Sequence, residues 1–282
     1  MDLSNENVIH VKNNGIEYLQ FRRLLEYKDK KKHAYALGIN NDFRTLTPDK
    51  KELPKERYER NINTYKKFFE ELNDDYTKII KPAQDHTDEI KVVKNKKYND
   101  RPEFETSDYF KTDGLITNKK DIILETTNAD CILLLFYDPV KEVIANTHSG
   151  WKGTIQRISV KTVEKMKNEF DCNPEDIICC ICPSIRKCHF EVDRDVKEMF
   201  ENEYKDLKND QLCDIIQEKI PNEKWNIDTV LINKIILQNA GLKKDNIVDS
   251  GICSVCHSDL IHSFRVEKQG YGLNAAFIMI EK

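Results

Sequence analysis

Apolar residues recur along this chain in short runs that predict strands separated by turns. The N-terminal segment is predicted as a hairpin, because two such segments flank the turn sequence Asn13-Asn14-Gly15. Later runs are continuous rather than alternating, as is typical of strands buried on both faces. The predicted strands cover residues 8–11, 16–21, 122–124, 131–137, 143–146, 177–181, 247–252 and 275–280.

Apolar positions at helical spacing predict helices between these strands. One covers residues 55–72, and a second apolar stripe covers residues 155–170. A third helix is predicted to begin after the N-cap Asp228 and to end at Gly241. The polar residues 94–107 are predicted as a loop. Mixed strands and helices, with no Gly/Ser-rich or Pro-rich linker, indicate one layered α/β or α+β domain.

The composition narrows the function classes without naming one. The chain has 282 residues, 39% of them hydrophobic and 33% charged, and a net charge of −4. This charge gives no electrostatic reason to expect nucleic acid as a partner. No secretory signal is visible at the start, and the longest apolar run is too short to cross a bilayer. We therefore expect a cytoplasmic protein whose nine cysteines are thiols or metal ligands.

Three residues in separate segments are candidates for one metal site. His86 lies in a Gln-Asp-His-Thr-Asp segment, Cys131 begins an apolar strand and His148 follows another strand. Two imidazoles and one thiolate suit zinc, and three protein ligands leave a fourth position for water or substrate. No two of them share a short metal-binding motif, however. A half-buried histidine and a structural thiol explain the same residues.

Several segments together resemble the laccase-domain family. Its members were first called polyphenol oxidases and later assigned as zinc-dependent purine nucleoside phosphorylases. The family carries Q-V-H-G-D, A-D-A-L-V-T, T-A-D-C and H-A-G-W-R-G-T in this order. Here the matching segments are residues 84–88, 112–117, 128–131 and 148–154, followed by residues 182–192 and 262–265.

The resemblance implies a fold, a metal and a reaction. It implies an α+β domain over residues 1–282, layered α/β/β/α, with mixed sheets flanked by helices. It implies Zn²⁺ bound by His86, Cys131 and His148. The implied substrates are a purine nucleoside of the adenosine or inosine type and phosphate, which give free base and ribose 1-phosphate. Some members also deaminate adenosine.

Carboxylates close to these ligands are candidates for supporting roles. Asp130 and Asp88 each lie near a ligand in the sequence, so either could orient it or transfer a proton. A cap or turn carboxylate is an equally good interpretation of both.

The departures from the family pattern concern its arginines. Lys152 stands where the family has arginine. The family's two adjacent arginines near the C-terminus correspond to Arg265 and Val266 here, so one of them is missing. The later T-G-R segment has also lost its arginine, around Gly272. Lysine keeps the charge but loses the two-pronged grip on phosphate. Lys152 and Arg265 are the predicted phosphate or ribose contacts, and the missing arginines bear on phosphorolysis more than on deamination.

Other readings of the cysteines and histidines stay open. A metal-free thiol hydrolase would use Cys131 as nucleophile and His148 as base, and a non-enzymatic protein would keep zinc without turnover. A copper laccase would need the His-x-His pairs that this chain lacks. The Cys253-x-x-Cys256-His257 segment has the c-type haem attachment pattern, but haem attachment of this kind belongs to exported proteins. Half of a structural zinc site is another interpretation of this segment, and plain buried thiols are the preferred one. The cysteines at 179, 180, 182 and 188 suggest a second metal site, but packing within a strand is the preferred explanation. The oligomeric state is left open.

Overall fold

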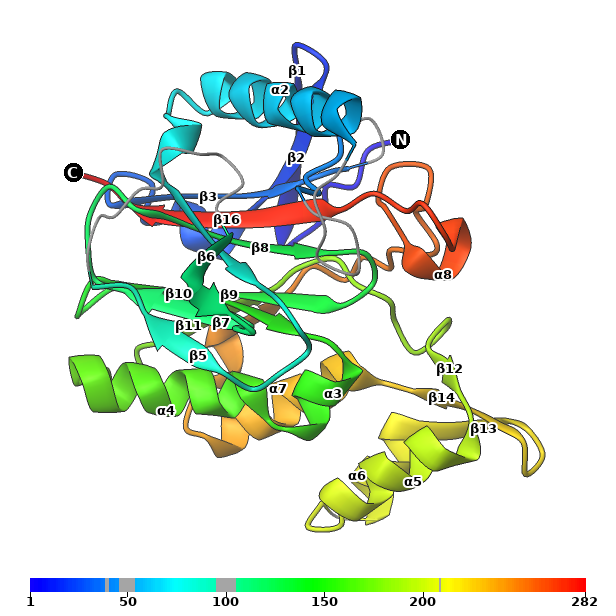
Figure 1. The fold of residues 1–282 in the computed structure, drawn as a ribbon. Coiled ribbons are helices and arrows are strands. Elements are labelled where there is room, and N and C mark those ends of the chain that lie inside the picture. Colours follow the sequence, from blue (N-terminus) through cyan, green and yellow to red (C-terminus); the bar gives the residue numbers. More distant parts are fainter. Residues whose placement is uncertain (39–40, 46–53, 95–104, 208) are drawn as a thin grey trace.

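Two β-sheets pack face to face, with helices outside each sheet (Figure 1). The layers are helix α2 (Lys55–Glu71), a seven-stranded sheet, a six-stranded sheet, and helices α4 (Ile158–Phe170) and α7 (Thr229–Asn239). The α+β class and the α/β/β/α layering expected from the sequence are confirmed. The structure is a computed structural model that describes residues 1–38, 41–45, 54–94, 105–207 and 209–282.

The seven-stranded sheet is built around the C-terminal strand. Strand β16 pairs antiparallel with β3 on one side and β8 on the other, whereas β4 lies parallel to both β8 and β6. Across the sheet, the strands are β1 (Val8–Asn13), β2 (Ile16–Phe21), β3 (Lys31–Ala36), β16 (Asn274–Ile280), β8 (Ile123–Asn128), β4 (Ile79–Ala83) and β6 (Glu105–Phe110).

The six-stranded sheet places β9 and β10 side by side at its centre. These two strands are antiparallel, and Ile132 at the start of β9 pairs with Ser149 at the end of β10. Across the sheet, the strands are β15 (Ile247–Asp249), β11 (Ile178–Ile181), β9 (Ile132–Asp138), β10 (Val143–Ser149), β7 (Gly114–Thr117) and β5 (Ile90–Val92).

Strand β9 is apolar from Ile132 to Tyr137, and both of its faces are buried. Leu133 and Leu135 belong to the core between the two sheets, whereas Leu134 and Phe136 belong to the core beneath α4 and α7. The alternation of side chains across a strand produces this division. The continuous apolar run of the sequence is therefore explained by two cores, one on each side of the strand.

The outer helices cover the sheets with the residues that the periodicity predicted. Helix α2 packs Phe68 and Phe69 against Phe277 of β16. The stripe over residues 155–170 is interrupted, because Arg157 has a φ of 56° and separates α3 (Trp151–Ile155) from α4. Asp228 caps α7 through the backbone N–H of Leu231, as predicted.

A smaller sheet and two helices form a lobe beside the main layers (Figure 1). Their bounds are β12 (Glu191–Val192), β14 (Lys224–Ile227), β13 (Ile216–Ile220), α5 (Arg194–Glu203) and α6 (Asn209–Ile215). The short elements elsewhere are α1 (Arg22–Leu25), η1 (Tyr76–Lys78), η2 (Lys244–Asn246) and α8 (Phe264–Glu267).

Several predicted elements have other bounds in the structure. The strand expected over residues 247–252 ends at Asp249, and the one expected over residues 122–124 extends to Asn128. The loop expected over residues 94–107 ends earlier, because β6 begins at Glu105 and pairs with β4. Polar sequence without alternation gave no local signal for this strand, which forms at the sheet edge. Residues 95–104 of the predicted loop lie outside the described residues.

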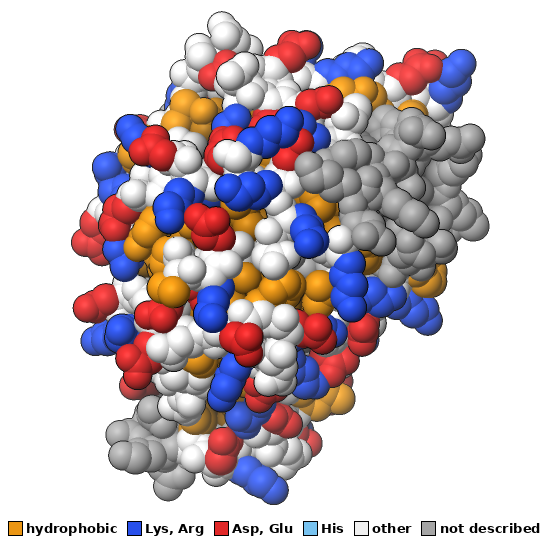
Figure 2. All heavy atoms as spheres, turned by 90° about the vertical axis from the view of Figure 1, so that its left-hand side faces the viewer, with side chains coloured by type: hydrophobic (Ala, Val, Ile, Leu, Met, Phe, Trp, Pro, Cys, Tyr) orange, Lys and Arg blue, Asp and Glu red, His pale blue; other side chains and the backbone are white. Residues whose placement is uncertain are grey.

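The surface carries mixed charges. Lysine and arginine side chains intermingle with aspartate and glutamate on the face shown in Figure 2. Among the described residues, no helix combines the length and apolar character that crossing a membrane requires.

Candidate metal centre

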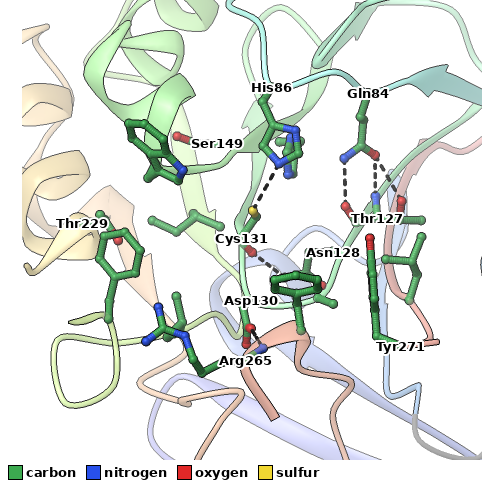
Figure 3. Close-up of a pocket in the computed structure, with 18 of the residues that line it drawn as sticks. Gln84, His86, Thr127, Asn128, Asp130, Cys131, Ser149, Thr229, Arg265 and Tyr271 are labelled. Carbon is green, nitrogen blue, oxygen red and sulfur yellow. Dashed lines mark hydrogen bonds between the residues drawn. The ribbon is translucent and has the colours of Figure 1, made fainter. Parts of the chain in front are cut away.

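Two neighbouring strands and one loop bring His86, Cys131 and His148 together. Cys131 directly precedes β9 and His148 is the penultimate residue of β10. Because these two strands are antiparallel, both residues lie at the same end of the strand pair. His86 reaches them from the segment after β4 in the other sheet (Figure 3). One ligand atom from each of the three lies within 4.8 Å of the others. The Cys131 Sγ is 3.8 Å from His86 Nε2.

Asp113 organises the two histidines. Its Oδ1 is 2.8 Å from His148 Nδ1 and accepts the backbone N–H of His86 at 3.1 Å. Its Oδ2 accepts the backbone N–H and the hydroxyl of Thr87, both at 2.7 Å. A carboxylate on one ring nitrogen fixes the tautomer of a histidine and leaves the other nitrogen free to bind a metal.

Burial and charge act against each other on these groups. Burial alone would raise the pKa of Asp113, but hydrogen bonds from His148 and Thr87 lower that pKa to about 2. Burial likewise opposes ionisation of Cys131, but His148 and His86 lower the pKa of its thiol to about 6. Cys131 therefore has the thiolate character that a metal ligand requires.

Gly150 leaves the space into which the ligands converge. A Cβ atom on Gly150 would lie 2.8 Å from His86 Cδ2 and 3.2 Å from Cys131 Sγ. Any larger residue would therefore displace a ligand. The glycine of the His-Ser-Gly segment is explained by this close approach.

The donor set fits a zinc ion. Two imidazole nitrogens and one thiolate are ligands that zinc prefers, and three protein ligands are typical of a catalytic site with one open position. The convergence of the three side chains, the carboxylate behind His148 and the cradle at Gly150 all agree with this geometry. His86, Cys131 and His148 are the residues that would hold the ion.

The three residues line a cavity of about 660 Å³. This volume is within the range of small-molecule sites. The wall includes four aromatic side chains, of which Phe264 is 53% exposed and forms a T-shaped pair with Tyr271 at 5.1 Å. The others are Trp151 and Phe190. Gln84 supports the wall by bonding to Thr127 on both the backbone and the side chain (Figure 3).

Asp130 and Arg265 both line this pocket, but their side chains already form hydrogen bonds with neighbouring loops. Asp130 accepts the Ser254 hydroxyl at 2.6 Å and the backbone N–H of Arg265 at 2.7 Å. The guanidinium of Arg265 donates to the backbone carbonyls of His189 and Glu191. Asp130 therefore connects the segments that carry Ser254 and Arg265. Within the described residues, it forms no hydrogen bond to His86 or His148.

Two other predicted residues lie away from the pocket. Lys152 is exposed, does not line the cavity, and has its Nζ 5.6 Å from the Trp151 ring centroid. Asp88 forms an ion pair with Lys161 on the surface. The structure therefore brings Arg265 and Asp130 to the pocket, but not Lys152 or Asp88.

Residues outside the predicted set complete the site. Asp113 stands in the segment compared with the family's A-D-A-L-V-T. It directly precedes β7, at the end of the strand that lies beside His148, and this position was the signal that could have identified it. Arg44 and Lys81 bring positive charge to the pocket wall. No local pattern marks Arg44, because it lies in an irregular segment far from the ligands in sequence.

Comparison with a family model agrees with the sequence resemblance. A model described as multi-copper polyphenol oxidoreductase laccase matches residues 55–281, a range that contains all three candidate ligands.

Curated relatives share part of this range. Purine nucleoside phosphorylase YlmD from Bacillus subtilis (strain 168) is 32% identical over 167 residues, covering 59% of this chain and 58% of the relative. The chain thus spans less than two thirds of the length of that protein. Adenosine deaminase RL5, from an unknown prokaryotic organism, is 29% identical over 196 residues, covering 69% of this chain and 72% of the relative.

A solved structure shares the fold. The crystal structure of YlmD from Geobacillus stearothermophilus superposes with a TM-score of 0.80 over 98% of this chain and 100% of that chain, at 20% identity. At this identity the likeness concerns the fold alone.

Proposed function

This chain belongs to the multi-copper polyphenol oxidoreductase laccase family, and from this premise we propose that it is a zinc-dependent purine nucleoside phosphorylase. The observation that carries the proposal is the convergence of His86, Cys131 and His148 on a cavity of about 660 Å³. Relatives named purine nucleoside phosphorylase and adenosine deaminase support the substrate class. In the proposed reaction the bond from ribose C1′ to the purine breaks. A bond from C1′ to a phosphate oxygen forms, and the departing base takes up a proton.

The protein residues divide the work of binding. A zinc ion held at this centre would supply a Lewis acid that draws charge from the purine. Asp113 keeps His148 in one orientation, so the ligand set is preorganised rather than assembled on binding. The Phe264 and Tyr271 rings offer apolar faces against which a purine can stack.

Arg44 is the residue proposed to bind phosphate. Its side chain is 3% exposed, and neither its Nε nor its Nη2 has a hydrogen-bond partner among the described residues. Its guanidinium lies 3.8 Å from the Tyr271 ring centroid and lines the cavity. A buried guanidinium with unused donors is costly unless an anion pairs with it.

The other cations of the pocket wall are already engaged. Lys81 donates to the Phe43 carbonyl and lies 3.3 Å from the Glu125 carboxylate. Arg265 donates to two backbone carbonyls. Arg44 is therefore better placed than Lys152 to replace the arginines that the family pattern has here and this chain lacks.

Product analysis tests the proposed function. Metal-quantified protein is incubated with adenosine or inosine, with and without phosphate. Free base and ribose 1-phosphate should form only when phosphate is present. Inosine from adenosine in both reactions would identify a deaminase instead, and no product from zinc-loaded protein would contradict the enzymatic proposal.

Substitution of Arg44 by alanine is expected to raise the KM for phosphate by about 10- to 100-fold, because a charge-assisted hydrogen bond is worth about 1.5–3 kcal/mol. Steady-state kinetics with phosphate varied at saturating nucleoside measure this effect. Arg60→Ala, on the exposed face of α2, is the matched control and should leave the KM unchanged. An unaltered phosphate KM in Arg44→Ala would exclude Arg44 from the phosphate site.

A metal-free thiol enzyme is the second candidate, and one observation favours it. His148 stands between Asp113 and Cys131, the order of a carboxylate–imidazole–thiol relay. Such a relay has no use for a second imidazole at the sulfur, whereas His86 Nε2 lies 3.8 Å from Cys131 Sγ. The zinc proposal therefore accounts for more of the site.

A further inference from the structure

A second group of metal-ligating side chains lies outside the pocket lining. Cys188 and His189 occupy a turn between β11 and β12, and Cys253 and Cys256 lie in the segment after β15. One ligand atom from each of the four lies within 4.8 Å of the others. A parallel bridge between Ser184 and Cys253 holds the two segments side by side. Two incomplete sequence signals thus combine into one set of four ligands.

The separations of these atoms match a single tetrahedral ion. The Sγ atoms of Cys188 and Cys253 are 3.7 Å apart. His189 Nδ1 lies 3.2 Å from Cys188 Sγ and 3.6 Å from the Sγ atoms of both Cys253 and Cys256. Zinc with Zn–S bonds of about 2.3 Å and Zn–N bonds of about 2.0 Å places its sulfurs about 3.8 Å apart and sulfur and nitrogen about 3.5 Å apart.

Core packing does not explain this group. Cys179, Cys180 and Cys182 are fully buried in and after β11, as expected of cysteines that fill a core. Cys188 and Cys256 are exposed instead, yet they turn towards the same point as Cys253. Core packing therefore accounts for the three strand cysteines, but not for Cys188 and Cys256.

A disulfide does not describe the group either. A disulfide has an S–S distance of about 2.0 Å, and the 3.7 Å between Cys188 and Cys253 is far longer. The nine cysteines are all free thiols in the structure. His189, whose ring nitrogen approaches three sulfurs, would have no place in a disulfide.

We infer that Cys188, His189, Cys253 and Cys256 form a second, structural zinc site. Four protein ligands fill a tetrahedral shell and leave no open position for water or substrate. The close spacing suits one ion rather than a multi-iron cluster. His257, the last residue of the haem-like pattern, is not a member of the group.

The site connects loops that form the wall of the pocket. The carbonyl of His189 accepts a hydrogen bond from Arg265, and the next residue, Phe190, lines the cavity. Ser254, between the two other ligands, donates to Asp130, which directly precedes Cys131. A zinc ion here would fix the distance between these loops, so its role would be positioning rather than catalysis.

Metal content measures the second site directly. Wild-type protein purified without added metal or chelator should hold about two zinc ions per chain, and Cys256→Ser about one. Cys213→Ser, which removes an exposed cysteine on α6, should match the wild type. Equal zinc in Cys256→Ser and the wild type would overturn the inference. If Cys256→Ser loses zinc and Cys131→Ser does not, the result would contradict the proposed catalytic centre but not the second site.

Two further measurements separate ligation from a folding defect. His189→Cys restores four zinc ligands and should keep the ion, whereas His189→Ala should lose it. Cobalt bound to Cys131→Ser protein should show the thiolate charge-transfer absorption of a tetrahedral sulfur-rich site. If His189→Cys and His189→Ala hold equal zinc, or if the cobalt protein lacks that absorption, the four residues do not form a metal site.

Discussion

Replacing Cys131 by serine is expected to remove zinc from the catalytic centre and to lower kcat/KM for phosphorolysis by about 1,000-fold or more, a loss of about 4 kcal/mol in transition-state stabilisation. The thiolate is the only anionic member of the ligand set, and a serine hydroxyl stays protonated and binds zinc poorly. The measurement pairs zinc content with kcat/KM. The control is Cys213→Ser, which replaces an exposed cysteine outside the pocket lining. Full zinc and full activity in Cys131→Ser would rule out this centre.

A thiol nucleophile would also lose activity in Cys131→Ser, so metal removal decides between the two chemistries. Wild-type protein treated with a chelator and dialysed should become inactive and should recover when zinc is restored. In Cys256→Ser, which would lack the second ion, an enzyme that uses Cys131 as a nucleophile would keep its activity throughout. The second site would respond to the same chelator, so recovery is followed in both wild type and Cys256→Ser.

Replacing Asp113 by asparagine is expected to weaken zinc binding at the catalytic centre by about 10- to 100-fold, because residues that orient metal-bound histidines have effects of this size. Asparagine keeps the shape of the side chain but removes the charge that faces His148 Nδ1. A competing chelator of known affinity measures the change. If Asp113 acts by positioning His148, excess zinc should restore much of the lost kcat/KM.

Asp88→Asn is the matched control for Asp113. Both carboxylates lie close to ligands in sequence or space, but Asp88 pairs with Lys161 at the surface. Its substitution should leave zinc affinity and kcat/KM unchanged. Similar losses in both variants would show that charge near the centre matters, not the contact between Asp113 and His148.

The sequence by itself determined the elements whose signals are local. The hairpin over β1 and β2, the aromatic stripe of α2 and the Asp228 cap of α7 each depend on residues a few positions apart. The two-sided burial of β9 was likewise visible as a continuous apolar run. The family motifs selected His86, Cys131 and His148, which the structure brings within 4.8 Å.

The tertiary structure alone decided which charged residues reach the pocket. Lys152 is next to Trp151 in the sequence, yet it is exposed and does not line the pocket, whereas Arg44 reaches the wall from a distant irregular segment. Similarly, Asp113 rather than Asp130 supports His148. Neighbours in sequence point in different directions from a strand or a helix, so proximity along the chain does not determine which side chains meet.

The second cysteine cluster shows the same division most clearly. Cys253 and Cys256 form a recognisable half-site in the sequence, but nothing local connects them to Cys188 and His189, more than 60 residues earlier. They meet because β11 and β15 pair in parallel, which places the segments after both strands at the same end of the sheet. Local periodicity determines which elements form. The order and register of strands distant in sequence determine which side chains become a site.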